Sequence, residues 1–168
     1  KTGAALDAGG NIVDWQMDVW SYPHSTRPAG KDGVNLLAAW HLAAPKPAAT
    51  PADPPLPAGG SHRNAIPLYD FPNQRVTNHL VMQSPLRASA LRALGGHANV
   101  FAIESFMDEL ATAAGTDPVE FRLRHLKDPR ARAVIEAAVQ QSGWKPGKPG
   151  DGTRGRGMGF ARYKNLGC

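Results

Sequence analysis

Hydrophobic and polar residues alternate near the start of the chain. Polar residues separate four hydrophobic ones at every second position, namely Val13, Trp15, Met17 and Val19. A period of two is typical of a strand with one buried and one solvated face. The turn-forming residues 7–10 (Asp-Ala-Gly-Gly) come just before this stretch. Residues 1–20 are therefore predicted to form a β-hairpin, and residues 75–82 a further strand.

From residue 99 onward, hydrophobic residues recur at spacings of three and four, which is typical of one face of a helix. The first helix is expected to begin with Asn99 as its N-cap and to end at Gly115. Its hydrophobic positions are Val100, Ile103, Met107, Leu110, Ala111 and Ala114.

Two Asp-Pro pairs predict the starts of two more helices. Asp117 and Asp128 can each cap a helix, and the proline after each fits the first helical position. Glu120 would close a capping box with Asp117, and Gly143 would end the last helix. The hydrophobic residues of that last helix are Val134, Ile135, Ala138 and Val139.

These elements divide the chain into four stretches. Residues 1–44 hold the hairpin and an irregular segment, and residues 45–60 form a proline-rich crossing. Residues 61–143 carry the strand, a Gly-Gly turn and the three helices. Residues 144–168 form a glycine-rich exit and the start of a further strand.

The fold class that these stretches predict is α+β. It combines a β-hairpin and strands, a proline-rich crossing, three short helices and an incomplete sheet. Residues 34–44 are expected to form either a short strand or a helical turn, and residues 158–163 the beginning of the last strand. A hairpin cut short at residue 1 and a strand begun near residue 168 suggest an internal piece of a larger protein.

Composition narrows the classes of function. The net charge is +5, but lysines and arginines are scattered and become dense only at residues 122–132 and 145–164. Nucleic-acid binding through residues 154–164 is therefore a disfavoured alternative. The single cysteine, Cys168, excludes an internal disulfide framework and a cysteine-based zinc site. No run of apolar residues is long enough to predict a membrane span.

The Gly-Gly turn before the first helix is the best candidate for binding chemistry. Backbone amides of such a turn at a helix N-terminus bind anionic groups, which points to residues 92–99 as a cofactor or phosphate cradle. His97 lies inside this turn, whereas no histidine of the chain has the spacing of a zinc site. Residues 150–155 match a dinucleotide-binding fingerprint, but neither a strand before them nor a helix after them is predicted.

Three acidic residues lie within two turns of the first helix: Glu104, Asp108 and Glu109. They could bind a metal or act as acid and base. A solvated face, or a buried pairing with Arg87 or Arg92, is the favoured interpretation. Taken alone, the residues support an anion-binding turn beside helices that pack on a sheet.

Several motifs taken together resemble one family. They are Leu91-Arg92-Ala93-Leu94-Gly95-Gly96, the helix at residues 106–111, Asp117-Pro118-Val119-Glu120-Phe121-Arg122 with Leu126, Tyr69-Asp70-Phe71-Pro72-Asn73, and residues 155–160. The pattern is similar to the molybdenum-binding subunit of the xanthine dehydrogenase and aldehyde oxidase family. The nearest branch includes isoquinoline 1-oxidoreductase and nicotinate dehydrogenase subunits.

The resemblance implies a molybdenum hydroxylase that oxidises an N-heteroaromatic or aldehyde substrate with oxygen derived from water. It places Arg92, Ala93, Gly95 and Gly96 against a molybdenum–pyranopterin cofactor, in some members a cytosine dinucleotide. Leu94 and His97 would line the substrate pocket. Leu94 replaces a family aromatic residue, which argues against stacking of a purine, and His97 replaces a proline.

The resemblance also implies partners. These are the remainder of the large subunit, a small iron–sulfur subunit that accepts the electrons, and a further acceptor such as a cytochrome or flavin subunit. The glutamate base of the family lies outside these residues, so the chain is expected to hold no catalytic residue and to be inactive alone. The rival hypothesis is a scaffold segment whose turn simply packs against its own helix.

Overall fold

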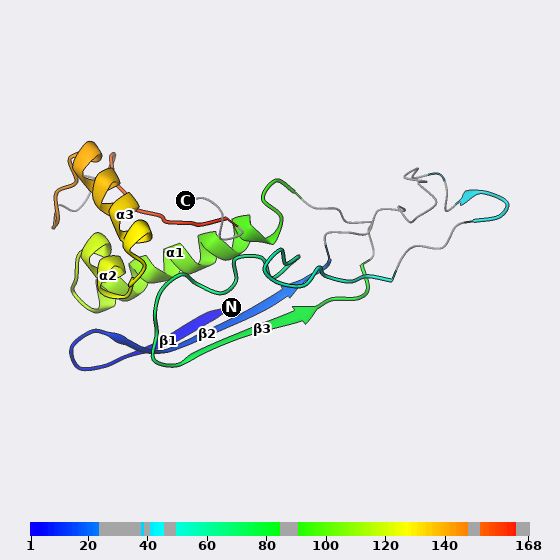
Figure 1. Ribbon diagram of the computed structural model, residues 1–168, viewed down its shortest axis with the longest axis horizontal. Coiled ribbons are helices and arrows are strands. Elements are labelled where there is room, and N and C mark those ends of the chain that lie inside the picture. The colour runs from blue at the N-terminus through cyan, green and yellow to red at the C-terminus, as the bar shows by residue number, and fades with distance from the viewer. Residues whose placement is uncertain (24–37, 39–40, 46–49, 85–90, 148–151, 164–168) are drawn as a thin grey trace.

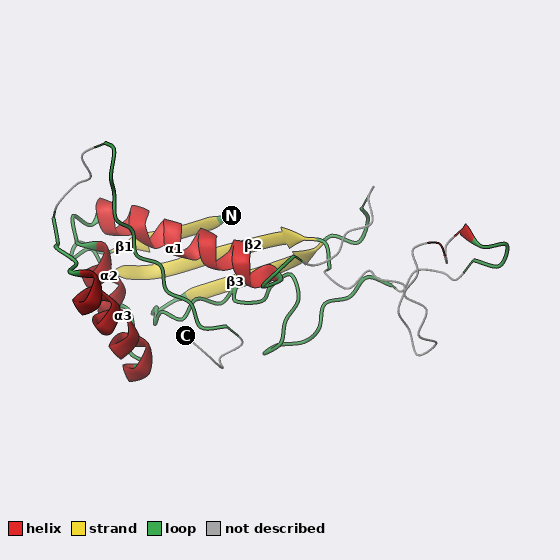
Figure 2. Ribbon diagram, turned by 90° about the horizontal axis from the view of Figure 1, so that it is seen from above, coloured by secondary structure: helices red, strands yellow, loops and turns green. Residues whose placement is uncertain are grey.

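The computed structural model describes residues 1–23, 38, 41–45, 50–84, 91–147 and 152–163. Their elements are β1 (Thr2–Leu6), β2 (Ile12–Ser21), β3 (Gln74–Leu80), α1 (Gly95–Ala113), α2 (Pro118–Arg124) and α3 (Pro129–Ser142). Helix α1 runs along one face of the sheet, and α2 and α3 lie near the end where the β1–β2 hairpin turns (Figures 1 and 2). The predicted α+β class is confirmed, although α1 is a long helix of 19 residues.

The sheet has the order β1-β2-β3 and mixes two kinds of pairing. Strands β1 and β2 form the predicted antiparallel hairpin, and the Asp7 carboxylate closes its turn by accepting the amides of Gly9 and Asn11 at 2.9 and 2.8 Å. Strand β3 pairs with β2 in parallel. A parallel neighbour requires a long crossover, and the described part of it, including residues 50–60 of the proline-rich crossing, contains no strand.

One core position of the predicted hairpin is wrong. Val13 was expected in the core, but Ile12 is 1% exposed and Val13 only half-buried. The pairing register shifts between Ala5 and Leu6, whose partners are Asp14 and Ile12, so Val13 is an extra residue on β2. Such a bulge moves the following side chains to the other face. The remaining alternation, from Trp15 to Val19, holds as predicted.

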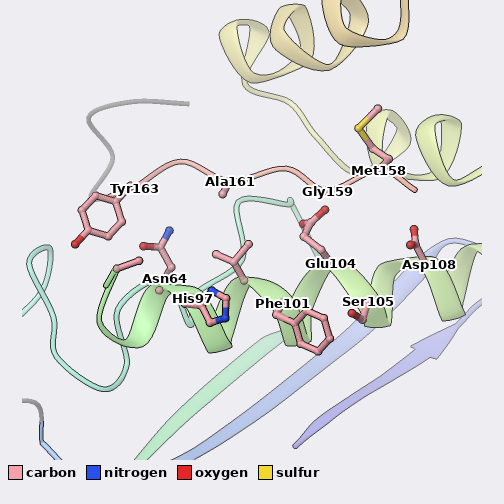
Figure 3. Close-up of a pocket in the computed structure, with 13 residues that line it drawn as sticks. Asn64, His97, Phe101, Glu104, Ser105, Asp108, Met158, Gly159, Ala161 and Tyr163 are labelled. Carbon is pink, nitrogen blue, oxygen red and sulfur yellow. The ribbon is translucent and has the colours of Figure 1, made fainter. Parts of the chain in front are cut away.

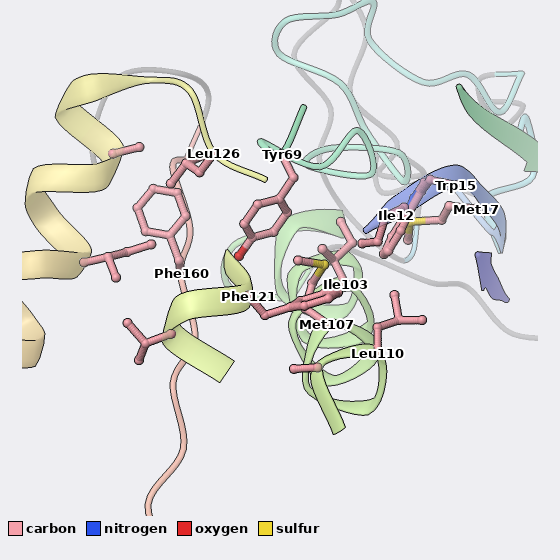
Figure 4. Packing of buried hydrophobic residues seen from close by; sticks show 14 of the residues in the cluster. Ile12, Trp15, Met17, Tyr69, Ile103, Met107, Leu110, Phe121, Leu126 and Phe160 are labelled. Atoms are coloured by element: carbon pink, nitrogen blue, oxygen red, sulfur yellow. The ribbon is translucent and has the colours of Figure 1, made fainter. Parts of the chain in front are cut away.

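The core lies between the sheet and the helices (Figure 4). Trp15 of β2 is fully buried, stacks on Phe71 with ring centroids 5.0 Å apart, and lies 5.5 Å from Phe106 of α1. The predicted helical face of α1 supplies buried side chains at Ile103, Met107, Leu110 and Ala111. Phe121 of α2 completes this cluster, so one core joins the hairpin, the long helix and the second helix.

Both Asp-Pro helix starts are confirmed. Asp117 Oδ1 accepts the amides of Val119 and Glu120 at the start of α2. Asp128 Oδ1 does the same at the start of α3, at 2.9 and 3.0 Å. The Glu120 carboxylate pairs with Arg124 at 3.0 Å, in place of the capping box.

The hydrophobic face predicted for α3 is partly wrong. Ile135 is 1% exposed, but Val134 is 40% exposed and Ala138 is exposed as well. Ala131, which was not among the predicted positions, is fully buried. The helix does end at Gly143, which adopts the left-handed conformation that favours glycine.

The last strand predicted for the chain does not form among the described residues. Residues 158–162 are extended but unpaired as a strand, and Tyr163 makes only an isolated bridge. Side chains take up the polar backbone atoms of this segment in place of a neighbouring strand, as described below. The element predicted at residues 34–44 lies largely outside the described residues.

Candidate functional site

The Gly-Gly turn opens helix α1 directly. The helix begins at Gly95 with Leu94 as its N-cap residue, so the predicted cap at Asn99 is wrong. Ala93 and Leu94 have φ values of +67° and +57°, a region that residues with a Cβ rarely adopt. No side chain caps the helix, and its first turn contains no acidic residue. This start therefore depends on contacts made with other parts of the chain.

Gly95 has a tertiary reason to be glycine. A Cβ on Gly95 would lie 2.3 Å from the carbonyl oxygen of Ser61 and 2.6 Å from that of Gly60. These distances are far inside van der Waals contact, so only glycine allows the two backbones to approach. A Cβ on Gly96 would instead lie 3.3 Å from Asn64 Oδ1 and 3.5 Å from the Tyr163 ring, at the edge of a groove.

That groove has a volume of about 460 Å³ and runs along α1 (Figure 3). One wall is a face of the helix that includes His97, Phe101 and Asp108, and the other is the extended segment at residues 158–163. Of the six predicted site residues, three line the groove, namely Ala93, Gly96 and His97. The other three, Arg92, Leu94 and Gly95, lie outside its lining. The Arg92 residue is exposed.

A buried ion pair forms part of the groove wall. Arg122 of α2 is fully buried, and its Nε donates to Glu104 Oε2 at 2.9 Å. Its Nη1 donates to Asp108 Oδ1 at 2.7 Å and to the carbonyl of Pro118 at 3.0 Å. Its Nη2 donates to the carbonyls of Glu104 and Met158. All five N–H donors of the guanidinium are therefore used.

The Glu104 carboxylate is equally occupied. Its Oε1 accepts from the Tyr69 hydroxyl at 2.9 Å, and its Oε2 accepts from the Phe160 amide as well as from Arg122. Burial and the adjacent Glu104 carboxylate raise the pKa of Tyr69 far above its usual range, so the hydroxyl remains a donor. A carboxylate with these partners fixes structure and has no free oxygen for proton transfer.

These contacts correct the interpretation of the acidic residues on α1. The predicted buried pairing exists, but its cation is Arg122, and Arg87 lies outside the described residues. Burial opposes the charge of Arg122, yet the Glu104 carboxylate holds the pKa of the guanidinium above its usual value. Among the described residues no group of three or more potential ligands could hold a metal ion.

The same ion pair anchors the extended segment across α1. Met158 and Phe160 are held by Arg122 and Glu104, and Asn64 Nδ2 donates to the carbonyl of Arg162 at 2.7 Å. Arg162 also pairs with Asp128 at 2.6 Å. Arg156 likewise donates to the carbonyls of Ser142 and Gly143. These two basic residues near the end of the described chain therefore contribute to folding contacts, which argues against the nucleic-acid alternative.

Sequence reasoning missed the polar residues that hold the turn from below. Asn99, the expected cap, donates through Nδ2 to the carbonyls of Ser61 and Arg63, both at 2.9 Å. Asp53, in the proline-rich crossing, accepts from Ser61 and Asn78. The sequence indicated this role only through Asn99, a polar residue next to the hydrophobic face of the helix, and Asn99 was interpreted as the helix cap.

The glycine-rich exit has no regular helix or strand among its described residues. Residues 152–157 form no helix, so the dinucleotide-binding fingerprint lacks the element that it requires. No helix in the described parts of the chain has the length and apolar character needed to cross a bilayer.

The known proteins to which this chain is similar are subunits of dehydrogenases and oxidoreductases. A nicotinate dehydrogenase subunit of Pseudomonas putida is 45% identical over 167 residues, which cover 94% of this chain. The beta subunit of isoquinoline 1-oxidoreductase of Brevundimonas diminuta is 35% identical over 94 residues, or 55% of the chain. The xanthine dehydrogenase molybdenum-binding subunit of Escherichia coli O157:H7 is 55% identical over 38 residues, or 23% of the chain.

These relatives are much longer than the chain. It spans 13%, 12% and 5% of their lengths, respectively. The sequence profile of the molybdopterin cofactor-binding domain matches residues 29–126, which include the Gly-Gly turn, α1 and α2. The resemblance found in the motifs is thereby confirmed, and the chain belongs to the molybdopterin cofactor-binding domain family.

Proposed function

We propose that this chain is a segment of a molybdenum hydroxylase subunit and contributes the turn at residues 92–96 to the site of a molybdenum–pyranopterin cofactor. The observation that carries the proposal is the start of α1, where Ala93 and Gly96 line the groove and no side chain caps the helix. The Gly96 amide already donates to the Ala93 carbonyl at 3.0 Å, whereas other amides at this helix N-terminus, which no side chain caps, would attract anionic groups such as a phosphate. When bound, the cofactor would supply a redox centre that accepts two electrons from the substrate.

A buried acceptor near the turn fits such a group. The Oδ1 atom of Asn64 is buried and has no hydrogen-bond partner among the described residues, and Asn64 lines the groove. A buried carbonyl oxygen without a donor is costly. A pterin carries N–H donors that would satisfy it. The residues present therefore fit the cofactor that the family binds.

Each residue of the turn then has a specific role. The exposed Arg92 donates charged hydrogen bonds to anionic groups of the cofactor, and Ala93 and Gly96 keep the neighbouring backbone accessible. The backbone contact of Gly95 fixes the turn. Leu94 and His97 lie on the substrate side, where Leu94 offers an apolar surface without an aromatic face and His97 offers an imidazole that can form a hydrogen bond.

The substrate that we propose is an N-heteroaromatic compound, with an aldehyde as the second choice. Two relatives are named for nicotinate and isoquinoline, which are both N-heteroaromatic. Both are also named as subunits, which supports partner subunits for the complete protein. The partners that we propose are a small iron–sulfur subunit as the electron acceptor and a cytochrome or flavin subunit after it. We propose that the complete protein binds the molybdenum–pyranopterin cofactor in its cytosine dinucleotide form.

Metal and pterin analysis of the full-length subunit, purified from its host, tests the proposal. We expect about one molybdenum and one pterin per subunit, and Arg92→Ala to lower both several-fold because it removes charged hydrogen bonds. Arg130→Ala, which removes another exposed arginine, is the matched control and should leave both unchanged. A subunit without molybdenum, or an Arg92→Ala variant with full content, would contradict the proposal.

The scaffold hypothesis is the second candidate, and one contact favours it. Gly95 packs directly against Ser61 and Gly60, so the glycine has a structural reason that requires no ligand. A well-folded full-length subunit that contains no molybdenum would support the scaffold. Stoichiometric molybdenum with pterin would reject it.

A further inference from the structure

A buried polar cluster lies in and around the loop against which Gly95 packs, and none of its residues lines the groove. It centres on the carboxylate of Asp53, whose side chain is 6% exposed. Its Oδ1 accepts from the Ser61 amide at 3.1 Å, and its Oδ2 accepts from the Ser61 hydroxyl and from Asn78 Nδ2, the latter at 3.1 Å. Since Asn78 belongs to β3, the carboxylate ties the loop at residues 53–64 to the sheet.

The loop at residues 53–64 also contacts the turn, so the position of Asp53 affects the position of the turn. Gly60 has no room for a side chain, because a Cβ there would lie 2.0 Å from Asp53 Oδ1. The carbonyls of Gly60 and Ser61 in turn form the surface on which Gly95 rests. Both contacts, Gly60 with Asp53 and Gly95 with the two carbonyls, are closely packed, so neither backbone can shift without moving its neighbour. The position of Gly95 is thus set by the position of Asp53.

A second connection fastens the same loop to α1 one turn further on. Asn99 is 5% exposed, and its Nδ2 donates to the carbonyls of Ser61 and Arg63, both at 2.9 Å. The loop is therefore held to β3 through Asp53 and to α1 through Asn99. Between these two connections the chain keeps Ala93 and Leu94 at positive φ, a conformation that is strained for residues with a Cβ.

We propose that Asp53 is a positioning residue for the cofactor turn, acting through Ser61 and Gly60 on Gly95. The inference rests on the proposed function, since the turn matters for chemistry only if it contacts the cofactor. Asp53 itself is not among the residues that line the groove. Its effect is to keep the backbone at residues 93–96 in one strained conformation before any ligand binds.

The charge state of Asp53 explains why a carboxylate is required. Burial raises the pKa of this group, but hydrogen bonds from Ser61, Asn78 and His62 more than offset burial and hold the pKa below its usual value. The group is therefore ionised at neutral pH and acts only as an acceptor. An amide in its place would direct an N–H group toward one of these donors.

The cluster is not a hydrolytic triad, although serine, histidine and aspartate meet in it. The Ser61 hydroxyl bonds to Asp53 and lies 3.1 Å from Asn78 Oδ1, and His62 Nδ1 lies 3.3 Å from the same carboxylate. Ser61 is 5% exposed. In a triad the serine hydroxyl donates to the imidazole, whereas the Ser61 hydroxyl donates to the Asp53 carboxylate and is too buried for a substrate to reach.

The test uses the full-length subunit and three variants. Asp53→Asn removes the carboxylate with almost no change in volume. Asp7→Asn makes the same change in a carboxylate that also accepts loop amides, but at the hairpin turn near the C-terminal end of α1. The double variant Asp53→Asn with Asn78→Asp exchanges amide and carboxylate, so that the amide at position 53 donates to a carboxylate at position 78.

Two measurements are made on each variant: molybdenum and pterin per folded subunit, and hydrogen exchange of the amides at residues 93–99. We expect Asp53→Asn to speed exchange at these amides about tenfold, since a buried donor loses its acceptor. We also expect it to lower cofactor content several-fold. Asp7→Asn should leave both at the level of the unaltered subunit, and the double variant should recover most of the loss.

The outcomes separate this inference from the proposed function. Unchanged exchange at residues 93–99 in Asp53→Asn would overturn the positioning role, even if the unaltered subunit holds molybdenum. Equal losses in Asp53→Asn and Asp7→Asn would overturn it as well, because they would indicate general destabilisation. Faster exchange with no change in cofactor content would show that the position of the turn does not govern binding. A molybdenum-free unaltered subunit would instead reject the proposed function.

Discussion

The starts of α1 and α2 differ in what holds them. Helix α2 begins with an aspartate cap followed by a proline at the first helical position, so all the necessary groups lie within four residues. Helix α1 begins after two residues at positive φ, with no side-chain cap, and rests on the carbonyls of Gly60 and Ser61 about 35 positions earlier in the sequence. The locally held start has a structural role, and the start held by distant residues is the candidate site.

The difference has a physical reason. A cap satisfies the first amides of a helix with a side-chain oxygen, and this removes them as donors for a ligand. A start held by backbone packing and by Asn99 is equally well fixed but leaves those amides without a side-chain acceptor. The strained backbone at Ala93 and Leu94 is the cost of that arrangement.

The largest expected effect comes from Gly95→Ala. Helix propensity alone would favour alanine by about 1 kcal/mol. The Cβ, however, would lie 2.3 Å from the Ser61 carbonyl oxygen, so we expect a net destabilisation of the α1 start by about 3 kcal/mol. Native-state hydrogen exchange of the full-length subunit measures this as faster exchange at the first amides of α1.

Gly3→Ala is the matched control for that change. A Cβ on Gly3 would meet nothing within 4 Å, and we expect an effect within about 0.5 kcal/mol. If Gly95→Ala slowed exchange at the α1 start, local propensity would govern both helix starts and the contrast between them would be wrong.

Removing the caps of α2 and α3 should cost less. Asp117→Ala and Asp128→Ala each leave two first-turn amides without their acceptor, which typically costs about 1 kcal/mol. The loss should appear as faster exchange at the affected helix and at the residue that the same carboxylate holds, which is Trp144 for Asp117 and Arg162 for Asp128. Asn in place of Asp at either position should restore most of it, since asparagine caps equally well. Faster exchange at α1 as well would indicate that the two kinds of start are not independent.

This contrast also explains how far the sequence predicts the molecule. The hairpin, the hydrophobic face of α1 and both Asp-Pro starts follow from patterns that lie within a few residues of each other, and the structure confirms them. The role of Asn99 could not be predicted in this way, because its partners are the carbonyls of Ser61 and Arg63. The bulge that buries Ile12 in place of Val13 is set by the partner strand.

In the candidate site, too, the features that depend on neighbouring residues were predicted, and those that depend on distant residues were not. The motif around Arg92 indicated the turn, and the cofactor contacts predicted there remain predictions. The ion pair of Glu104 with Arg122 joins two helices, so sequence spacing pointed only to a buried pairing and not to its cation. Asp53 lies in a proline-rich stretch that was expected to be a surface crossing, and only the fold brings it to Ser61.

The smallest expected effect is a pH dependence at His125, which links α2 to the hairpin. Its Nε2 accepts the amide of Ile12 at 2.9 Å, and its Nδ1 donates to the carbonyl of Phe121 at 2.9 Å. Burial lowers the pKa of this imidazole below its usual value. In the unfolded chain His125 is protonated below about pH 6.5, whereas in the folded chain it is protonated only at a lower pH. The free energy of unfolding therefore decreases as the pH falls below about 6.5.

The slope is at most about 1.4 kcal/mol per pH unit for one group, and stability should be constant with respect to His125 above pH 7. His125→Gln places an amide oxygen near the Ile12 amide without a titrating group, so it should remove this part of the pH dependence between pH 5 and 7. Hydrogen exchange at the start of β2, corrected for the intrinsic effect of pH, measures it in both proteins. Equal dependence in the two would mean that the imidazole accepts a proton without losing the Ile12 contact, and α2 would then be joined to the hairpin by packing alone.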